Sequence, residues 1–386
     1  MATIARRGSD ELATTTTARQ RPDLWLLSLI GALCLLGLVM VYSASYATAA
    51  LDNGTAQLLR QGMYLAFGWV ALFVLMRVDY HVWRRFALPA MMVAVALLIL
   101  VLIMPSSSLN DVNGAKRWIY IGSQGFQPSE LAKLAFVLYL ASWLSLRGSD
   151  KVGNLTRGLI PFGIVLGLVV ALLMREPDMG SSLVFVCIGV GMFFVAGADL
   201  LQLAAGMTLA AGTFVLLIRA ATYRSGRVDS WLNPWSDPQG SGYHAIQSMV
   251  ALGSGGFFGL GLGASRQKFS WLPEQYTDTI FSIIGEELGM VGAMLVILLF
   301  GSLVYCGYRV ALHAPDSFGA LLATGITSWF GFQALINIGA VTNSIPFTGI
   351  TLPFISAGGS ALIFALAGAG VLLNISKQAT SAVSRK

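Results

Sequence analysis

The chain has 386 residues, of which 56% are apolar and only 11% charged, and its formal net charge is +6. A soluble domain of this size would need about a quarter of its residues charged to cover its surface. The mean hydropathy of +0.73 points the same way. This balance excludes a water-soluble enzyme or binding domain and predicts a protein that crosses a membrane several times.

Ten apolar segments follow one another along the chain. Because only helices and closed barrels satisfy their backbone in hydrocarbon, and these runs are continuous, they are predicted to be helices. The expected fold is all-α, with about ten transmembrane helices in a membrane domain at 24–376 and polar tails at 1–23 and 377–386. The predicted spans cover residues 24–46, 61–77, 86–105, 129–146, 158–174, 181–197, 200–220, 279–307, 317–341 and 351–375.

Lysine and arginine residues in short loops predict the orientation, because such loops stay in the cytoplasm. With the N-terminus inside, most of the 24 basic residues fall in inner segments and both termini are cytoplasmic. Outward basic residues oppose this topology signal, so those that remain suggest binding of an anionic head group. They gather in a few polar outer segments: Lys116, Arg117, Lys133, Arg175, Arg224, Arg227, Arg266 and Lys268.

The spacing of cysteine, histidine and glycine excludes several other site classes. Cys34, Cys187 and Cys306 lie singly in separate apolar runs, and the three histidines are equally scattered. Neither a disulfide framework nor a zinc site is indicated. The glycine-rich segment GSGGFFGLGLG has no G-x-G-x-x-G pattern after a strand, so it is not a nucleotide-binding loop. We expect it to be a re-entrant or interfacial segment packed closely on the helices.

The second outer segment leads into a span that carries two charges. Glu130 and Lys133 follow Pro128 and lie three residues apart on one face of the predicted helix. One interpretation is an ion pair that neutralises itself and holds two helices together. The other is a pair facing a polar cavity, with Lys116 and Arg117 just outside it, because intramembrane charges usually face a cavity.

The third outer segment, MREPDMGSS, places Arg175, Glu176 and Asp178 within four residues. Pro177 and Gly180 already supply the chemistry of a turn, so the charges suggest a binding role. Helix capping by Asp178 is an equally open interpretation.

The long outer segment at about 221–278 ends in the residue that we favour as catalytic. Asp278 stands at the mouth of an apolar span, where partial desolvation would raise its pKa and fit it to take a proton from a hydroxyl. Capping of that helix is the alternative. Glu286 and Glu287 lie further along the same helix and are expected to hold helices together through hydrogen bonds or an ion pair. Trp231, Trp235, Phe257, Phe258 and Trp271 suit the membrane interface.

Long motifs recur in a fixed order from Leu24 to Ser376. They are LGLVMVYSAS at 36–45, NGAKRWIYIG with FQPSELAK at 113–133, EPDMGSS at 176–182, GSGYHAIQSMVALGSGGFFGLGLGASRQK at 240–268, LPEQYTDTIFSIIGEELG at 272–289 and LPFISAGGSALI at 352–363. The chain thereby resembles the SEDS family (FtsW, RodA and SpoVE) of peptidoglycan polymerases. Asn113 and the GLGASRQK segment are more similar to the FtsW division branch. The chain departs from the family's His-Thr-Asp-Phe at Tyr276 and Thr279, and retains the acid.

This resemblance implies an inverting glycosyltransferase of the cytoplasmic membrane, acting at the division septum, that polymerises lipid II into β-1,4 glycan strands on the outer face. It implies the family's essential acid at Asp278, its charged pair at Glu130 and Lys133, its loop arginine at Arg117 and its loop acid at Asp178. Together with the residue pattern, it predicts a substrate-binding set for pyrophosphate and sugar: Lys116, Arg117, Glu130, Lys133, Arg175, Asp178, Arg266 and Lys268.

Cofactors and partners are also expected from this resemblance. A divalent cation, Mg²⁺ or Mn²⁺, could bind between pyrophosphate and Asp178 or Asp278, and no organic cofactor is expected. The partners expected are lipid II, undecaprenyl-pyrophosphate-linked glycan, a class B penicillin-binding protein, other division proteins and membrane lipid, and no nucleic acid. The alternatives are a lipid II flippase, which would need a polar path through the bilayer, an elongation-type RodA polymerase and a division scaffold without activity.

Overall fold

The computed structural model describes residues 21–49, 55–104, 111–112, 115–122, 124–147, 152–219, 222–269 and 271–383. The predicted N-terminal tail up to residue 20 lies outside the described residues. The predicted C-terminal tail begins within a helix, because the last helix continues to Val383.

Every predicted span falls on a helix. Seven helices of the described residues are long and apolar enough to cross a membrane, and shorter apolar helices lie at Met179–Val195 and Leu200–Thr213. The all-α prediction is confirmed, whereas the number of spans stays a prediction. The ten helices are α1 (Leu24–Ala49), α2 (Thr55–Arg77), α3 (Tyr80–Ile103), α4 (Pro128–Ser145), α6 (Ile160–Arg175), α7 (Met179–Val195), α8 (Leu200–Arg219), α11 (Ile280–Leu312), α12 (Ser317–Val341) and α13 (Gly359–Val383).

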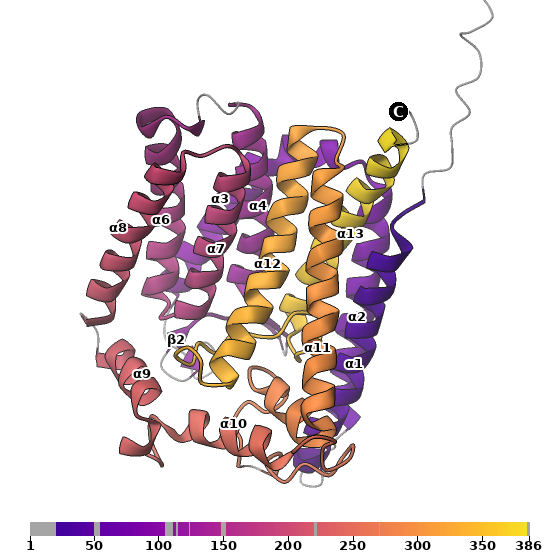
Figure 1. The fold of residues 1–386 in the computed structure, drawn as a ribbon, viewed down its shortest axis with the longest axis vertical. Coiled ribbons are helices and arrows are strands. Elements are labelled where there is room, and N and C mark those ends of the chain that lie inside the picture. Colours follow the sequence, from indigo (N-terminus) through magenta and orange to yellow (C-terminus); the bar gives the residue numbers. More distant parts are fainter. Residues whose placement is uncertain are drawn as a thin grey trace, which may run out of the picture.

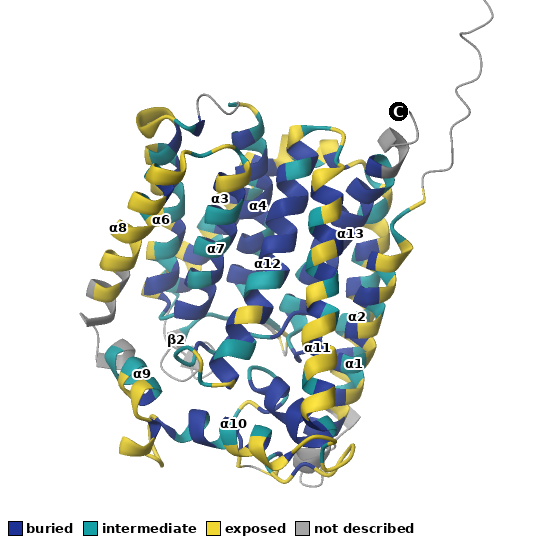
Figure 2. Ribbon diagram, in the orientation of Figure 1, coloured by how far each residue is buried: buried dark blue, intermediate teal, exposed yellow. Residues whose placement is uncertain are grey.

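The long helices stand side by side, and α12 lies at the centre of the bundle (Figure 1). It packs against α4, α7 and α11, and most of its residues are buried (Figure 2). The exposed faces of the outer helices are apolar, as at Leu201 and Leu209 of α8. Apolar side chains on an outer helical face are what hydrocarbon requires.

Close packing in the bundle depends on small residues. The most extensive helix pair is α2 with α13. A Cβ atom at Gly370 of α13 would lie 2.5 Å from the carbonyl oxygen of Leu72 in α2. Glycine therefore lets the two backbones approach more closely than any side chain would allow.

The polar connections lie at the lower end of the bundle as drawn in Figure 1, and they are more ordered than the sequence indicates. The segment before α4 forms two short antiparallel hairpins, β1 (Asp111–Val112) with β2 (Ala115–Lys116) and β3 (Ile119–Ile121) with β4 (Gln124–Phe126). The connection at 221–278 contains α9 (Thr222–Leu232), the 3₁₀ turn η2 (Pro234–Ser236) and α10 (Tyr243–Ser254). A π-helical turn, η1 (Leu155–Leu159), precedes α6 at the opposite end.

Two predicted spans differ from the helices observed. The last was expected to begin at 351, but α13 begins at Gly359, because residues 342–358 form a non-helical connector with turns, which includes Pro353. Helix α11 is not straight, since Gly289 has φ 68° and ψ −164°.

The glycine-rich segment packs on this break in α11. The amide groups of Leu260 and Gly261 donate to the carbonyls of Glu286 and Glu287 at 3.0 Å, and Met290 donates to Gly256 at 3.0 Å. The expected close packing is thus observed.

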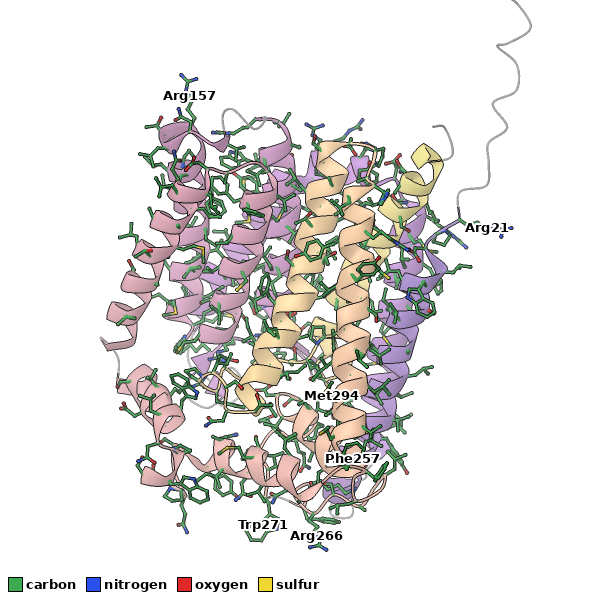
Figure 3. The ribbon with its side chains drawn as sticks, viewed as in Figure 1. Arg21, Arg157, Phe257, Arg266, Trp271 and Met294 are labelled. Atoms are coloured by element: carbon green, nitrogen blue, oxygen red, sulfur yellow. The ribbon has the colours of Figure 1, made fainter. Side chains whose placement is uncertain are left out.

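Basic residues mark both ends of the bundle. Figure 3 places Arg157 at the upper end and Arg21 beside the upper half of the bundle, with Arg266, Phe257 and Trp271 at the lower end. This separation agrees with the predicted assignment of the first two to the inner side and of Arg266 to the outer side. The aromatic residues expected at the interface are exposed at Trp235, Phe257, Phe258 and Trp271, whereas Trp231 is partly buried.

Candidate functional site

A cavity of about 680 Å³ lies where the α9–α10 layer meets the ends of the bundle helices. Its lining contains four residues of the predicted site: Arg117, Glu130, Asp178 and Asp278. They come from the β2–β3 connection, the first turn of α4, the start of α7 and the residues just before α11. Three connections far apart in sequence therefore meet at one polar pocket, as predicted.

The backbone around Asp278 is held from two sides. Asn337 of α12 donates its side-chain amide to the carbonyl oxygen of Asp278 at 2.8 Å and to that of Ile350 at 2.6 Å. In the connector before α13, Ser356 donates its hydroxyl to the carbonyl oxygen of Thr277 at 2.6 Å. The helix cap is Thr279, and no side-chain capping bond is made there. The alternative that Asp278 is only a cap is not what the structure shows.

The carboxyl group of Asp278 faces the cavity. Gly349, with φ +68°, is so close that a Cβ atom there would lie 3.2 Å from Asp278 Oδ2. Desolvation by burial, together with the charge of Glu274, raises the pKa of Asp278 from 3.8 to about 7, against the opposing charges of Arg117 and Arg227. A carboxyl group with this pKa exchanges a proton readily near neutral pH.

Arg117 is anchored on the turn between α6 and α7. Its Nε donates to the carbonyl oxygen of Glu176 at 3.1 Å, and its guanidinium also donates to the carbonyl oxygen of Pro177. These neutral partners fix the side chain without an opposing carboxylate. The guanidinium thereby brings a positive charge to the cavity wall.

Glu176 and Asp178 lie two residues apart on that turn, and their carboxyl groups have different environments. Asp178 accepts a hydrogen bond from the amide of Ser181 at 3.0 Å, so the capping interpretation is confirmed, and it lines the cavity as well. Glu176 is 1% exposed. Burial, and secondly the charge of Asp178, raise its pKa from 4.5 to about 9 in spite of Arg117. Glu176 is therefore a neutral acid at pH 7.

Glu130 and Lys133 form a buried ion pair, which is the first of the two interpretations that the sequence allowed. Lys133 Nζ lies 2.8 Å from Glu130 Oε1 and 2.7 Å from Gln333 Oε1, and it stands over the ring of Trp329. Glu130 lines the large cavity, whereas Lys133 is absent from its lining. The pair therefore joins α4 to α12 and also presents one carboxylate to the cavity.

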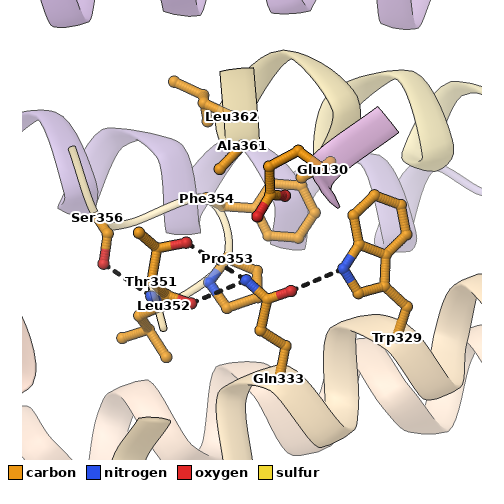
Figure 4. Close-up of a pocket in the computed structure, with 11 residues that line it drawn as sticks. Glu130, Trp329, Gln333, Thr351, Leu352, Pro353, Phe354, Ser356, Ala361 and Leu362 are labelled. Atoms are coloured by element: carbon orange, nitrogen blue, oxygen red, sulfur yellow. Dashed lines mark hydrogen bonds between the residues drawn. The ribbon is translucent and has the colours of Figure 1, made fainter. Parts of the chain in front are cut away.

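Glu130 also borders a second, much smaller cavity of about 10 Å³, which Figure 4 shows in close-up. Gln333 crosses this space, accepting from Trp329 Nε1 at 2.7 Å and donating to the carbonyl oxygen of Thr351 at 2.9 Å. The bond to Thr351 ties α12 to the connector that also holds the backbone beside Asp278.

Besides Lys133, four cations of the predicted set lie outside the cavity lining. Arg175 and Arg266 are exposed, and neither contributes to the cavity lining. Lys116 donates to the carbonyl oxygen of Met104 at 3.2 Å, outside the lining. Lys268 is fully buried and bound to Glu287 at 3.1 Å. Their expected convergence on the pocket was wrong, because proximity in a loop sequence does not determine which way a side chain points.

Glu286 and Glu287 hold the long connection against the bundle, as expected. Glu287 accepts from Ser43 of α1 and from Lys268, and Glu286 accepts from the backbone amide of Arg266 at 2.9 Å and from the Ser265 hydroxyl. The two acids that a polar transport path would have used are therefore engaged in fixing the loop.

Other cavity residues were missing from the predicted binding set. Arg227 was noted only as an outward basic residue, and Trp231, His244 and Glu274 were assigned no site role. The helical spacing of Arg227 and Trp231 on α9, which places them on one face, is the signal that could have indicated them.

The acidic residues of the lining could contribute ligands to a metal ion. In the described part of the chain, no group of three or more His, Cys, Asp or Glu side chains is arranged to hold one. Asp178 and Asp278 nevertheless line the same cavity. Two carboxylates suit a hard cation only if further oxygen ligands come from a bound substrate.

The fold and cavity define a class: a polytopic helical membrane protein with a charged pocket at one end of its bundle. A family profile described as "Cell cycle protein", covering FtsW, RodA and SpoVE, matches residues 24–381. The chain belongs to this family.

Individual relatives span nearly the whole chain. Stage V sporulation protein E of Bacillus subtilis is 45% identical over 94% of this chain and 99% of its own length. The probable peptidoglycan glycosyltransferase FtsW of Trichlorobacter lovleyi is 42% identical, covering 92% and 93%. Solved structures agree in fold: the rod shape determining protein RodA of Thermus thermophilus has a TM-score of 0.67 at 29% identity, covering 92% of this chain and 96% of its own.

A further solved structure comes from work on "Structural coordination of polymerization and crosslinking by a peptidoglycan synthase complex". Its chain matches with a TM-score of 0.76 at 31% identity, and the match covers 92% of this chain and 97% of that chain. The family and the fold are therefore established by sequence and by structure.

Proposed function

We propose that this protein is a peptidoglycan glycosyltransferase that polymerises lipid II on the outer face of the cytoplasmic membrane. The observation that carries the proposal is the single cavity in which Asp278 lies with Arg117 and Asp178. Relatives named as probable peptidoglycan glycosyltransferases, 40–42% identical, support it.

In the proposed reaction, the 4-hydroxyl oxygen of the GlcNAc on one lipid II attacks C1 of the lipid-linked sugar of the other. The new C1–O bond forms as the bond from C1 to the pyrophosphate breaks, so the α-linkage becomes β-1,4. Asp278 takes the hydroxyl proton as general base. Arg117 stabilises the negative charge on the departing lipid pyrophosphate.

The pocket suits a single displacement. Asp278 has the near-neutral pKa of a general base, while Asp178 accepts from the Ser181 amide, Glu130 is paired with Lys133 and Glu274 accepts from the Thr277 hydroxyl. No carboxylate of the described lining is thus left as an evident nucleophile for a covalent intermediate, which supports inversion.

We also propose that a divalent cation takes part in this chemistry. Asp178 or Asp278 would hold Mg²⁺ or Mn²⁺ together with pyrophosphate oxygens. When bound, such an ion supplies charge neutralisation to the leaving group. The corresponding measurement compares polymerisation with a chelator and with each metal restored.

We further propose a role in septal wall synthesis with a class B penicillin-binding protein as crosslinking partner. The named FtsW relatives and the matched chain of a peptidoglycan synthase complex support this assignment. The sporulation relative at 45% identity makes a spore-wall role the competing assignment. Depletion of the protein during vegetative growth separates them: filaments support division, and normal division with defective spores supports the alternative.

Reconstitution tests the activity. The protein is purified with its transpeptidase, supplied with labelled lipid II in liposomes, and the glycan is separated by size. Polymer from the native protein and none from Asp278→Asn is the expected result. Translocation of lipid II without polymer would instead support a flippase, and the absence of both activities would support a scaffold.

A further inference from the structure

The reaction proposed above consumes two molecules that each carry a lipid pyrophosphate. Among the described residues, the cavity lining correspondingly contains two arginines on different elements: Arg117 between β2 and β3, and Arg227 on α9. Both guanidinium charges oppose the rise in the pKa of Asp278, so both lie within electrostatic reach of its carboxyl group.

Arg227 is built into its own wall of the cavity. Its guanidinium donates to the carbonyl oxygen of Phe347 at 3.0 Å. One turn further along α9, Trp231 donates its indole N–H to the carbonyl oxygen of Asn343 at 3.0 Å. These two bonds fix α9 to the connector between α12 and α13, so the wall is preorganised and independent of the turn that holds Arg117.

The surroundings of Arg227 have the composition of a sugar-phosphate subsite. His244 stacks on Phe347 with ring centroids 5.1 Å apart, and Trp231 and Ser241 complete the lining there. Burial, and secondly the charge of Arg227, lower the pKa of His244, so its imidazole is neutral at pH 7. Aromatic faces with a few convergent polar groups are typical of ligand-binding walls.

One acidic group lies on this side of the cavity. Glu274 contributes to the lining, and its carboxylate accepts from the hydroxyl of Thr277 at 2.9 Å. The charge of Glu274 acts on both Asp278 and His244. Its carboxylate therefore lies within electrostatic reach of both the Asp278 carboxyl group and the imidazole of His244.

We propose that Arg227 marks a second substrate subsite, in which it binds the pyrophosphate of one lipid-linked sugar while Arg117 binds that of the other. The inference rests on the proposed glycosyltransferase function and adds to it the way in which donor and acceptor are held together. In this arrangement the two sugars meet at the carboxyl group of Asp278, which lines the same cavity as both arginines. Arginine suits both positions because its planar group binds phosphate oxygens in a bidentate manner.

Binding stoichiometry tests this without turnover. The Asp278→Asn protein is placed in lipid nanodiscs and titrated with fluorescent lipid II, and the number of molecules bound at saturation is counted. We expect two per protein. Adding Arg227→Met should leave one high-affinity site and weaken the other at least about tenfold, as expected when a charge-assisted contact is lost.

Matched variants control for misfolding. Arg227→Lys keeps a cation and should keep two sites with a smaller loss, and Arg266→Met removes an exposed arginine outside the cavity and should change nothing. Thermal unfolding of each variant is measured in parallel. Arg117→Met should remove the other site.

Each failure has a distinct signature. Two unchanged sites in Asp278→Asn with Arg227→Met would overturn the second subsite and leave the proposed function standing. No binding of lipid II by Asp278→Asn itself would contradict the proposed function, and the second subsite with it.

Discussion

At the scale of single residues, the account depends most on the carboxyl group of Asp278. We expect Asp278→Asn to lower the polymerisation rate by about 10² to 10⁴, the usual contribution of a general base. In the native protein the rate should rise with pH through about 7, because burial holds the pKa of Asp278 near that value and only the ionised form accepts a proton. Initial rates between pH 5.5 and 8.5 measure the profile. A rate that is flat across this range would contradict the assignment.

Glu176 offers a second test at the same scale. Its pKa is raised from 4.5 to about 9, so the native state favours the protonated form. The stability that the protonated Glu176 side chain contributes to the native state is fully present below about pH 4.5. It is lost as the pH rises towards 9, because the unfolded chain ionises this group first. We therefore expect Glu176→Gln, which stays neutral, to gain stability relative to the native protein between pH 6 and pH 9. Thermal unfolding in detergent measures the difference.

The control for Glu176 is Glu274→Gln, since Glu274 is an exposed acid of the cavity lining, whereas Glu176 is buried. Its stability relative to the native protein should change little over the same pH range. An equal change in both variants would show that the effect does not come from burial of Glu176.

At this scale, a site residue could be predicted when its charge was unusual for its position in the chain. Asp278 and Arg117 were predicted because an acid before an apolar span and an outward arginine are each unusual. Lys268 was misassigned, because its partner Glu287 is 19 residues away and the fold alone brings them within 3.1 Å. Charge and loop position identify candidates, whereas partners come from tertiary structure.

At the scale of elements, the break in α11 positions the long connection. A Cβ atom at Gly289 would lie 2.3 Å from the amide nitrogen of Gly259 and 2.6 Å from the carbonyl oxygen of Phe257. We expect Gly289→Ala to displace the glycine-rich segment and to lower both stability and activity, because φ +68° is also unfavourable for alanine. Unfolding temperature and polymerisation rate are the two readouts.

Gly301 provides the matched control on the same helix, because a Cβ atom there meets nothing within 4 Å. Gly301→Ala should be neutral or slightly stabilising, as alanine is the better helix former by about 1 kcal/mol. Equal destabilisation by both substitutions would show that any side chain on α11 is harmful, and not that the break matters.

Helix positions were predictable from continuous apolar runs, whose length and hydropathy a membrane requires. The break at Gly289 was not, since one glycine in an apolar run looks like any other until the backbone of Gly259 lies against it. Helices α9 and α10 were missed for a related reason: they have only 11 and 12 residues, and their packing on the rest of the protein stabilises them.

At the scale of the whole molecule, the proposed chemistry requires the cavity end of the bundle to face outward. With Cys34, Cys187 and Cys306 replaced by alanine, we expect a cysteine at Arg266 to react with a membrane-impermeant maleimide in intact spheroplasts. A cysteine at Arg157 should react only after permeabilisation. Both side chains are exposed and lie at opposite ends in Figure 3. The reverse pattern would place the cavity in the cytoplasm and contradict polymerisation on the outer face.

The central claim is that one cavity holds the reacting groups of lipid II against Asp278. Cryo-electron microscopy of the Asp278→Asn protein with its transpeptidase and lipid II in nanodiscs tests it most directly, since the substrate is trapped before reaction. The account predicts sugar-phosphate density within the cavity, with the phosphates at Arg117 and a sugar hydroxyl facing position 278. Density confined to a lipid-facing surface of the bundle, with the cavity containing only solvent, would contradict it.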